Sequence, residues 1–292
     1  MLSKSGLFVL SLSCASLLLS VNSAEAKKGK TEKTTVKVTK EKVEVKKTAT
    51  KVNADAYNAN KEGTKLGMYE HPLQALEKFN EAIKLDPNYA LAYANRGNTH
   101  MLLGKTSEAL KDLDKAIALD SNMAVAYANR SWAYNVMRNY KAAIADCDKA
   151  IKLNSKLVLA YTNRAHAHNK LGNHEAALAD CNLAIKTNPE FAPAYVNRSH
   201  TNIGLKNYKA AIQDANKAIE LNPGSAKAYL NRGHALRHLG ELDESMADFD
   251  KAIALNKTLG AAYFNRSETL QAKSDKDMET ARKLGFRTTD DK

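Results

Sequence analysis

The chain has 292 residues, a formal net charge of +12, one tryptophan and three cysteines. The charge is uneven, because the first 51 residues hold 11 lysines and 4 acidic residues and so carry +7 of the total. The other 241 residues carry only +5 and show no motif for reading bases, which argues against a nucleic-acid-binding protein.

Residues 1–26 have the pattern of an export signal peptide. Lys4 provides the positive start, an apolar run extends from Leu7 to Val21, and Ala24 and Ala26 supply the small residues that a signal peptidase requires. An uncleaved anchor is the alternative, although the apolar run is short for a membrane span. Cys14 lies in the middle of this run, which does not favour lipidation. We therefore expect an exported protein that is periplasmic or secreted.

Residues 27–54 form a lysine-rich segment for which we predict a disordered linker. It has no aromatic residue before Tyr57 and cannot bury enough apolar surface to offset the entropy of ordering. Valines alternate with polar residues, as in a strand, at Val36, Val38, Val43 and Val45. No sheet edge is evident in the sequence for such a strand to join. An anionic envelope surface is one candidate for weak contact with these lysines, and simple solvation is the other.

A 34-residue repeat organises the rest of the chain. The stretch Ala92-Tyr93-Ala94-Asn95-Arg96 returns five more times with only its middle residue changed, starting at Ala126, Ala160, Ala194, Ala228 and Ala262. A second amphipathic run follows each copy, and in the first full unit it carries Ala109, Leu113 and Ala116. Each period is therefore predicted to be a helix, a short turn and a second helix, and a strict period of this length indicates a solenoid.

These residues resemble the tetratricopeptide repeat (TPR) family. The resemblance rests on an aromatic residue early in each first helix, a small residue four places later, glycine at several turns, a recurring alanine in the second helix and proline closing several units, as at Tyr93, Gly97, Gly104, Ala116 and Pro87. The family implies an all-α fold, a right-handed superhelical solenoid of helix-turn-helix hairpins with a concave groove lined by the first helices. It also implies protein partners.

The array is predicted to span residues 55–285, with six full repeats and a truncated seventh. The first repeat is degenerate, as expected for a terminal unit with one uncovered face. In the seventh, a helical stripe resumes about five residues early, with Met278 and Ala281, so residues 274–284 are predicted to form a separate capping helix. Residues 286–292 are predicted to be a disordered tail.

An arginine in every full repeat is followed sixteen residues later by an aspartate. The predicted pairs are Arg96–Asp112, Arg130–Asp146, Arg164–Asp180, Arg198–Asp214 and Arg232–Asp248. The first repeat reverses the signs with Glu62 and Lys78, and alignment of the capping helix places Asp277 opposite Arg266. A row of arginines could bind a ligand, but the matched and sign-swapped partners favour an ion pair within each hairpin.

The asparagine before each arginine is a candidate for peptide binding. The set is Asn95, Asn129, Asn163, Asn197, Asn231 and Asn265. A side-chain amide can pair with both the amide hydrogen and the carbonyl of an extended peptide, so amides repeated along the groove would bind backbone. The alternative is that these amides bond to neighbouring helices and specify their stacking.

Three residues beyond each asparagine, the same face carries further candidates: Asn98, Trp132, His166, His200, His234 and Glu268. Trp132 could anchor a peptide or pack in the core. The histidines could be merely solvated, or could make binding pH-dependent. His234 and His238 have the i, i+4 spacing of metal ligands but lack a third, so we expect no metal site.

No catalytic motif interrupts the repeat, and neither an enzyme activity nor a cofactor is expected. Cys147 and Cys181 lie one period apart at a core position and are predicted to be buried thiols. The flanking groove positions are apolar or small rather than basic, which does not favour a clamp for an acidic C-terminus. We predict an exported scaffold that binds extended polypeptide segments, in envelope assembly or secretion. The alternatives are a structural spacer that self-associates through its ends, and a metal- or pH-responsive binder.

Overall fold

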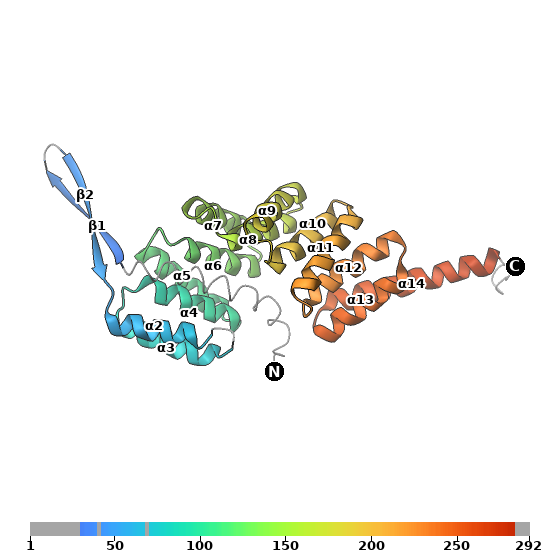
Figure 1. Ribbon diagram of the computed structural model, residues 1–292, viewed down its shortest axis with the longest axis horizontal. Helices are drawn as coiled ribbons and strands as arrows, with labels where there is room; N and C mark the ends of the chain where they lie inside the picture. Colours follow the sequence, from blue (N-terminus) through green and yellow to red (C-terminus); the bar gives the residue numbers. More distant parts are fainter. Residues whose placement is uncertain (1–29, 40–41, 68–69, 284–292) are drawn as a thin grey trace. The chain divides into compact units, whose positions relative to one another are not determined.

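The structure is a computed structural model that describes residues 30–39, 42–67 and 70–283. Within these ranges thirteen helices follow one another in short-linked pairs, with one longer helix at the end (Figure 1). The pairs are α2 (Ala54–Lys65) and α3 (Pro72–Leu85), α4 (Ala90–Leu102) and α5 (Thr106–Leu119), α6 (Ala124–Val136) and α7 (Tyr140–Leu153), α8 (Val158–Lys170) and α9 (His174–Thr187), α10 (Ala192–Gly204) and α11 (Tyr208–Leu221), and α12 (Ala226–Leu239) and α13 (Leu242–Leu255), followed by α14 (Gly260–Lys283). The predicted all-α solenoid of helical hairpins is confirmed.

The predicted signal peptide and the C-terminal tail lie outside the described residues. The chain divides into two compact units, with the boundary inside α8 between Ala167 and His168. We call the described residues up to Ala167 the N-terminal unit and those from His168 the C-terminal unit, and each is described by itself.

The lysine-rich segment differs from the predicted disordered linker. It contains two antiparallel strands, β1 (Lys30–Thr39) and β2 (Lys42–Lys51), that pair with each other. Val36 lies opposite Val45, and Val38 lies opposite Val43. The alternation of valine with polar residues does form a strand pattern, because the segment supplies its own partner strand. This hairpin was not predicted, because the valine pattern was compared only with an external sheet edge.

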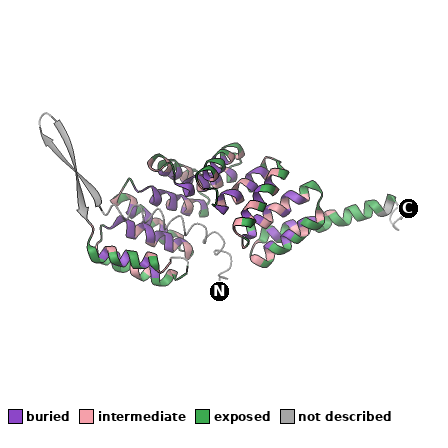
Figure 2. Cartoon of the chain, viewed as in Figure 1, coloured by how far each residue is buried: buried purple, intermediate pink, exposed green. Residues whose placement is uncertain are grey.

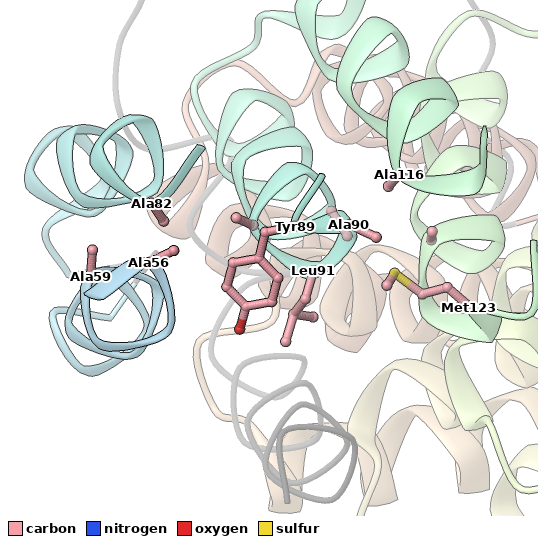
Figure 3. Packing of buried hydrophobic residues seen from close by; sticks show 11 residues of the cluster. Ala56, Ala59, Ala82, Tyr89, Ala90, Leu91, Ala116 and Met123 are labelled. Carbon is pink, nitrogen blue, oxygen red and sulfur yellow. The ribbon is translucent and has the colours of Figure 1, made fainter. Parts of the chain in front are cut away.

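Small residues set the spacing of the helices. Alanines at matching positions of the second helices are fully buried, including Ala82, Ala116 and Ala150 in the N-terminal unit. In that unit Ala56 and Ala59 of α2 pack with Ala82 of α3 in one cluster (Figure 3). A side chain on Gly97 would place its Cβ 2.9 Å from Cγ of Leu113 and 3.2 Å from the carbonyl oxygen of Ala109. The first and second helices therefore pack closely only because this position is small.

An aspartate or asparagine ends each second helix and starts the connection to the next first helix. Its side-chain oxygen accepts a hydrogen bond from the backbone nitrogen two residues on, at 2.9–3.0 Å, in Asp86, Asp120, Asn154, Asn188, Asn222 and Asn256. Such turns satisfy backbone groups that the helix end leaves unpaired. The same polar residue thus terminates one hairpin and fixes the entry to the next.

The turn inside each interior hairpin requires a left-handed backbone. Gly104, Gly172 and Gly240 have φ of 74°, 78° and 82° at equivalent positions. The two repeats without glycine place Arg138 and Lys206 there, with φ of 60° and 61°. A side chain with a Cβ is strained in this conformation, so these two turns are less favourable than the glycine turns.

The predicted capping helix is wrong in one respect. Residues 274–283 do form a helix, but it is the second half of α14, which runs without interruption from Gly260 to Lys283. Arg266 and Asp277 are therefore about 16 Å apart along one helix axis, given a rise of about 1.5 Å per residue, and cannot form the predicted pair. Arg266 instead donates to Asp250 of α13, with Nη1 2.7 Å from Oδ1.

Candidate interaction site

The arginines of the first helices pair with the predicted aspartates. In the N-terminal unit Arg96 donates through Nε and Nη2 to both carboxylate oxygens of Asp112, at 2.8 and 2.6 Å. Equivalent two-point contacts join Arg130 to Asp146, Arg198 to Asp214 and Arg232 to Asp248. The sign-swapped pair is also present, with Lys78 Nζ 3.0 Å from a carboxylate oxygen of Glu62. The pair Arg164–Asp180 spans the two units and stays a prediction.

Each arginine also makes a contact that the sequence analysis missed. Its Nη1 donates to the residue sixteen positions earlier, on the second helix of the preceding hairpin. The acceptors are Asn80, Asp114, Asp148, Asn182, Asn216 and Asp250, at 2.5–2.8 Å. Asparagine and aspartate both offer a side-chain oxygen here. The sequence feature that could have predicted this contact is therefore a recurring hydrogen-bond acceptor rather than a recurring charge.

The guanidinium groups also lie over aromatic rings. Each is 5.4–5.8 Å from the ring centre of the tyrosine three residues earlier on its own helix, as for Arg96 over Tyr93 and Arg266 over Tyr263. This is a distance at which a cation and a ring attract. The arginine thus joins its own first helix to two second helices, a structural role that leucine could not fill.

The candidate asparagines are largely buried and use their amide nitrogens inside the array. Asn163 Nδ2 donates to the carbonyl of Ala128 and the hydroxyl of Ser131, at 3.0 and 3.1 Å, and Asn231 donates to the carbonyl of Val196 at 2.9 Å. Asn95 donates to Asn60 at 3.0 Å. These partners lie on the preceding first helix, which is the geometry of the stacking alternative.

The remaining asparagines of this set follow no single pattern. Asn129 is buried, Asn197 is half-buried, and Asn265 donates to Ala261 of its own helix at 2.7 Å. Peptide binding by the six amides stays a prediction. Any such binding would use amide oxygens more than nitrogens in the repeats whose nitrogens are engaged.

Trp132 and His166 lie on first helices of the N-terminal unit. Trp132 is half-buried and packs beside Met101, Ala109 and Ala133, so part of its ring belongs to the core while part remains accessible. His166 is half-buried as well. These positions can contribute only partial surfaces to a ligand.

The C-terminal unit gathers positive charge on its first helices. His200 of α10 is exposed, and its neighbours include Lys170 and Lys227, which are exposed too. Crowding by surrounding protein, and then the charge of Lys170, lowers the pKa of His200, and the same two causes lower the pKa of Lys227. Among the described residues neither lysine has an acidic partner. This basic cluster (Lys170, His200 and Lys227) could not be predicted from the repeat pattern, because its members come from different positions of three repeats.

His234 and His238 form a second group on α12. Their Nε2 atoms are 3.1 Å apart, and the ring of His238 stacks on Tyr208 with centroids 4.5 Å apart. Burial, and then the charge of His238, lowers the pKa of His234 to about 4, so it is neutral near pH 7. In the described parts of the chain, no three His, Cys, Asp or Glu side chains come together as a metal site.

The two cysteines of the array are free and buried, as predicted. Burial raises the pKa of the Cys181 thiol to about 12, which removes the thiolate needed for nucleophilic chemistry. Across residues 30–39, 42–67 and 70–283 we find no helix long and apolar enough to cross a membrane.

Comparison with known families identifies the repeat. Family models described as tetratricopeptide repeat match residues 90–123, 124–157, 158–191, 192–225 and 226–259, and one described as TPR repeat matches residues 73–104. The chain belongs to the tetratricopeptide repeat family. The matches cover most of the array and follow the 34-residue period, so this TPR protein carries the repeat that serves as a protein-interaction scaffold.

Solved TPR structures share this fold. The crystal structure of the APC/C hetero-tetramer Cut9–Hcn1 contains a chain with a TM-score of 0.69 and 16% identity, covering 74% of this TPR protein and 43% of that chain. PilW, a type IV pilus biogenesis factor, gives a TM-score of 0.62 and 18% identity over 73% of this chain and 98% of its own. The thermophilic TPR protein TTC0263 of Thermus thermophilus gives a TM-score of 0.55 and 16% identity over 62% of this chain and 99% of its own.

At these identities the likeness concerns the fold alone, and this chain spans less than half of the Cut9–Hcn1 chain that it matches. None of the curated proteins compared with the chain matches it.

Proposed function

We propose that this TPR protein is an exported scaffold that binds extended segments of other proteins along its first helices, and that its C-terminal unit favours segments carrying a carboxylate. The observation that supports this most directly is the basic cluster of Lys170, His200 and Lys227. Crowding by surrounding protein lowers the pKa of His200 to about 4, so it is neutral near pH 7, but the two exposed lysines, unlike the arginines of the array, have no acidic partner among the described residues. A ligand carboxylate would relieve their mutual repulsion.

Apolar surface near the cluster would contribute the rest of the binding. Val196 and Leu230 are half-buried on α10 and α12, and Phe264 of α14 is 63% exposed. Adjacent first helices of this unit contact one another, α10 with α12 and α12 with α14. An extended segment with small or apolar side chains and one acidic group fits this chemistry, because apolar contact supplies affinity while the charge fixes orientation.

A capture experiment tests the proposal. The array would be used as bait in an extract of the exporting cell, and binding of the captured partner would then be measured for the Lys170→Ser, Lys227→Ser double variant. We expect at least tenfold weaker binding, about 1.4 kcal/mol, and reduced sensitivity of binding to salt. The matched control replaces the exposed second-helix residues Lys209 and Lys251 with serine. Equal loss in both variants, or none in either, would contradict the role of the cluster.

The asparagines need a separate test. Replacing Asn163, Asn197 and Asn231 with alanine should lower the melting temperature, because two of these amides donate to the preceding helix and each lost bond costs about 0.5 to 1.5 kcal/mol. If binding of the captured partner also falls for the folded variant, the amides contribute to recognition as well. Weaker binding without a change in melting temperature would assign them to recognition alone.

Export rests on the N-terminal sequence. The mature chain should begin at Lys27 and occur outside the cytoplasm, which N-terminal sequencing of the native protein after cell fractionation checks directly. A protein that retained Met1 in a cytosolic fraction would contradict export and its proposed role in envelope assembly or secretion, while leaving the protein-binding proposal intact.

A further inference from the structure

The last helix, α14, starts as an ordinary first helix of the repeat. It carries the sequence Ala262-Tyr263-Phe264-Asn265-Arg266, and it contacts both α12 and α13. Arg266 reaches Asp250 of α13 and lies over Tyr263, as its equivalents do. Asn265 and Thr269 are buried against the unit. The first half of α14 therefore occupies the position of a seventh first helix.

The turn that should follow is missing from the sequence. Aligning Ser274 and Asp277 with Ser245 and Asp248 of the preceding repeat leaves the seventh repeat five residues short. The five absent residues correspond to His238–Leu242, which contain the end of α12, the left-handed Gly240 and the start of α13. Without them the chain cannot reverse direction, and the helix continues instead.

The second half of α14 therefore carries the chemistry of a second helix, and its side chains are exposed among the residues that the structure describes. Met278 lies at the position of Phe249, which is fully buried in α13, yet Met278 is 36% exposed. On the first half, Leu270 is 52% exposed while its equivalent Leu236 is 7% exposed. Figure 2 shows α14 as exposed along most of its length. The contact between first and second helix, present in α12 and α13, is absent from the seventh repeat.

The two exposed halves share one face of the helix. Tyr263, Ser267, Leu270, Ser274 and Met278 are spaced by four, three, four and four residues, and all five are exposed. This spacing places them in a single stripe along a straight helix. A continuous stripe of this kind can pack along a second helix, as the seam of a coiled coil does.

We propose that two copies of this chain pair through antiparallel α14 helices, so that the second half of each α14 serves as the second helix of the other copy's seventh repeat. A two-fold axis between Gln271 and Ala272 places Arg266 of one copy opposite Asp277 of the other, and the same contact repeats by symmetry.

This pairing reproduces the Arg232–Asp248 contact of α12 and α13, whose Nη2 and Oδ1 atoms are 2.7 Å apart. The charge complementarity and the shared register identify a second copy as the occupant of the stripe. A hairpin whose turn is lost can be completed between chains, as in domain swapping.

Restoring the turn is the sharpest test. A copy of His238–Leu242 inserted between Gln271 and Ala272 should allow the seventh repeat to close on itself. Light scattering after size-exclusion chromatography is expected to show that the mass of the unmodified chain approaches twice the monomer mass as concentration increases. The insertion variant is expected to stay at the monomer mass. An unmodified chain that stays monomeric at high concentration would overturn the proposal, and so would an insertion variant that stays dimeric.

A disulfide trap locates the contact. Ser267→Cys and Met278→Cys in one chain lie eleven residues apart, about 16 Å along α14, which is too far for a bond within one copy. In the proposed dimer they meet between copies, as Gly233 meets Phe249 within a hairpin. We expect a covalent dimer on a non-reducing gel, and none from the Glu268→Cys, Met278→Cys control. A dimer from both variants, or from neither, would place the interface elsewhere.

A charge swap separates the ion pair from general damage to the helix. Arg266→Asp and Asp277→Arg should each weaken dimerisation, and the double variant should recover part of the loss, because Arg266→Asp also removes the bond to Asp250. A double variant as weak as the two single changes together would exclude the Arg266–Asp277 contact.

Discussion

Hairpin α12/α13 and helix α14 begin with the same sequence pattern, yet only the hairpin buries it. In α12, Gly233 packs against α13 and Leu236 is buried, whereas in α14 the equivalent Ser267 and Leu270 are exposed. The difference is five residues of turn, not the residues of the helix itself. Burial in this array is therefore a property of helix pairs, because each first helix has an apolar stripe that only its second helix can cover.

The first hairpin, at the other end of the array, also leaves exposed a contact that interior hairpins bury. Its ion pair, Lys78 with Glu62, is well exposed, whereas the interior aspartates Asp112 and Asp146 are buried. The sign reversal at the end of the array is thus tolerated where solvent screens the pair. Interior and terminal pairs should consequently differ in their contribution to stability.

Breaking an interior arginine contact should have the largest effect. Arg130→Ala removes bonds to Asp146 and Asp114 and leaves the Asp146 carboxylate buried, so we expect a loss of about 1.5 to 3 kcal/mol in the free energy of unfolding. The matched terminal change, Lys78→Ala, should cost much less, because solvent screens this exposed pair. Urea unfolding of both variants measures the difference, and equal losses would contradict it.

A cycle with Asp146→Ala tests the contact itself. The Arg130→Ala, Asp146→Ala double variant should be more stable than the sum of the two single losses predicts, with a coupling of about 0.5 to 3 kcal/mol.

Overpacking the contact between two helices should cause the next largest loss of stability. Gly97→Leu would force a side chain against Leu113 and the backbone of Ala109, and should destabilise the array by about 1 to 3 kcal/mol. Gly260→Leu at the start of α14 is the control, since a Cβ there meets no atom within 4 Å. Thermal unfolding of both variants distinguishes a crowded interior from an open end. A comparable loss at Gly260 would contradict the packing argument, because leucine favours the helix more than glycine does and meets no atom there.

Relieving a strained turn should have the smallest effect, and of the opposite sign. Arg138→Gly places glycine where the backbone has φ of 60°, and we expect a gain of about 1 kcal/mol in stability. Lys206→Gly should behave in the same way. The control is Arg237→Gly in the last turn of α12, which should destabilise by about 1 kcal/mol, because glycine weakens a helix and the pair with Glu268 is lost. If Arg138→Gly is also destabilising, the arginine side chain makes a contact that outweighs the strain.

Much of the fold could be predicted because the residues that make each contact recur at the same spacing in successive repeats. The helix pairs and the Arg96–Asp112 type of contact followed from spacing alone. The second arginine acceptor was harder to recognise, since Asn80 and Asp114 share an oxygen but not a charge. The basic cluster was missed for a different reason: Lys170 and Lys227 meet only when hairpins stack, and no fixed sequence spacing repeats it.

The errors at the two ends have a common cause. The shortened seventh repeat suggests a turn plus a capping helix, because the stripe at Met278 is easier to recognise than the loss of the turn. The lysine-rich segment suggests a disordered linker as long as its valines are compared with an external sheet rather than with each other. In both cases the sequence pattern was correct, and the choice of packing partner was not.

The three-way contact of each arginine also bears on how the array unfolds. Because Arg130 links its own hairpin to Asp114 of the hairpin before it, opening one hairpin removes a bond from its neighbour. Coupling of this kind makes nearest neighbours unfold together, as in a one-dimensional chain of interacting units. Hydrogen exchange should accordingly show whole hairpins opening as blocks, with protection lowest at the terminal hairpin that has a lysine pair instead of this arginine.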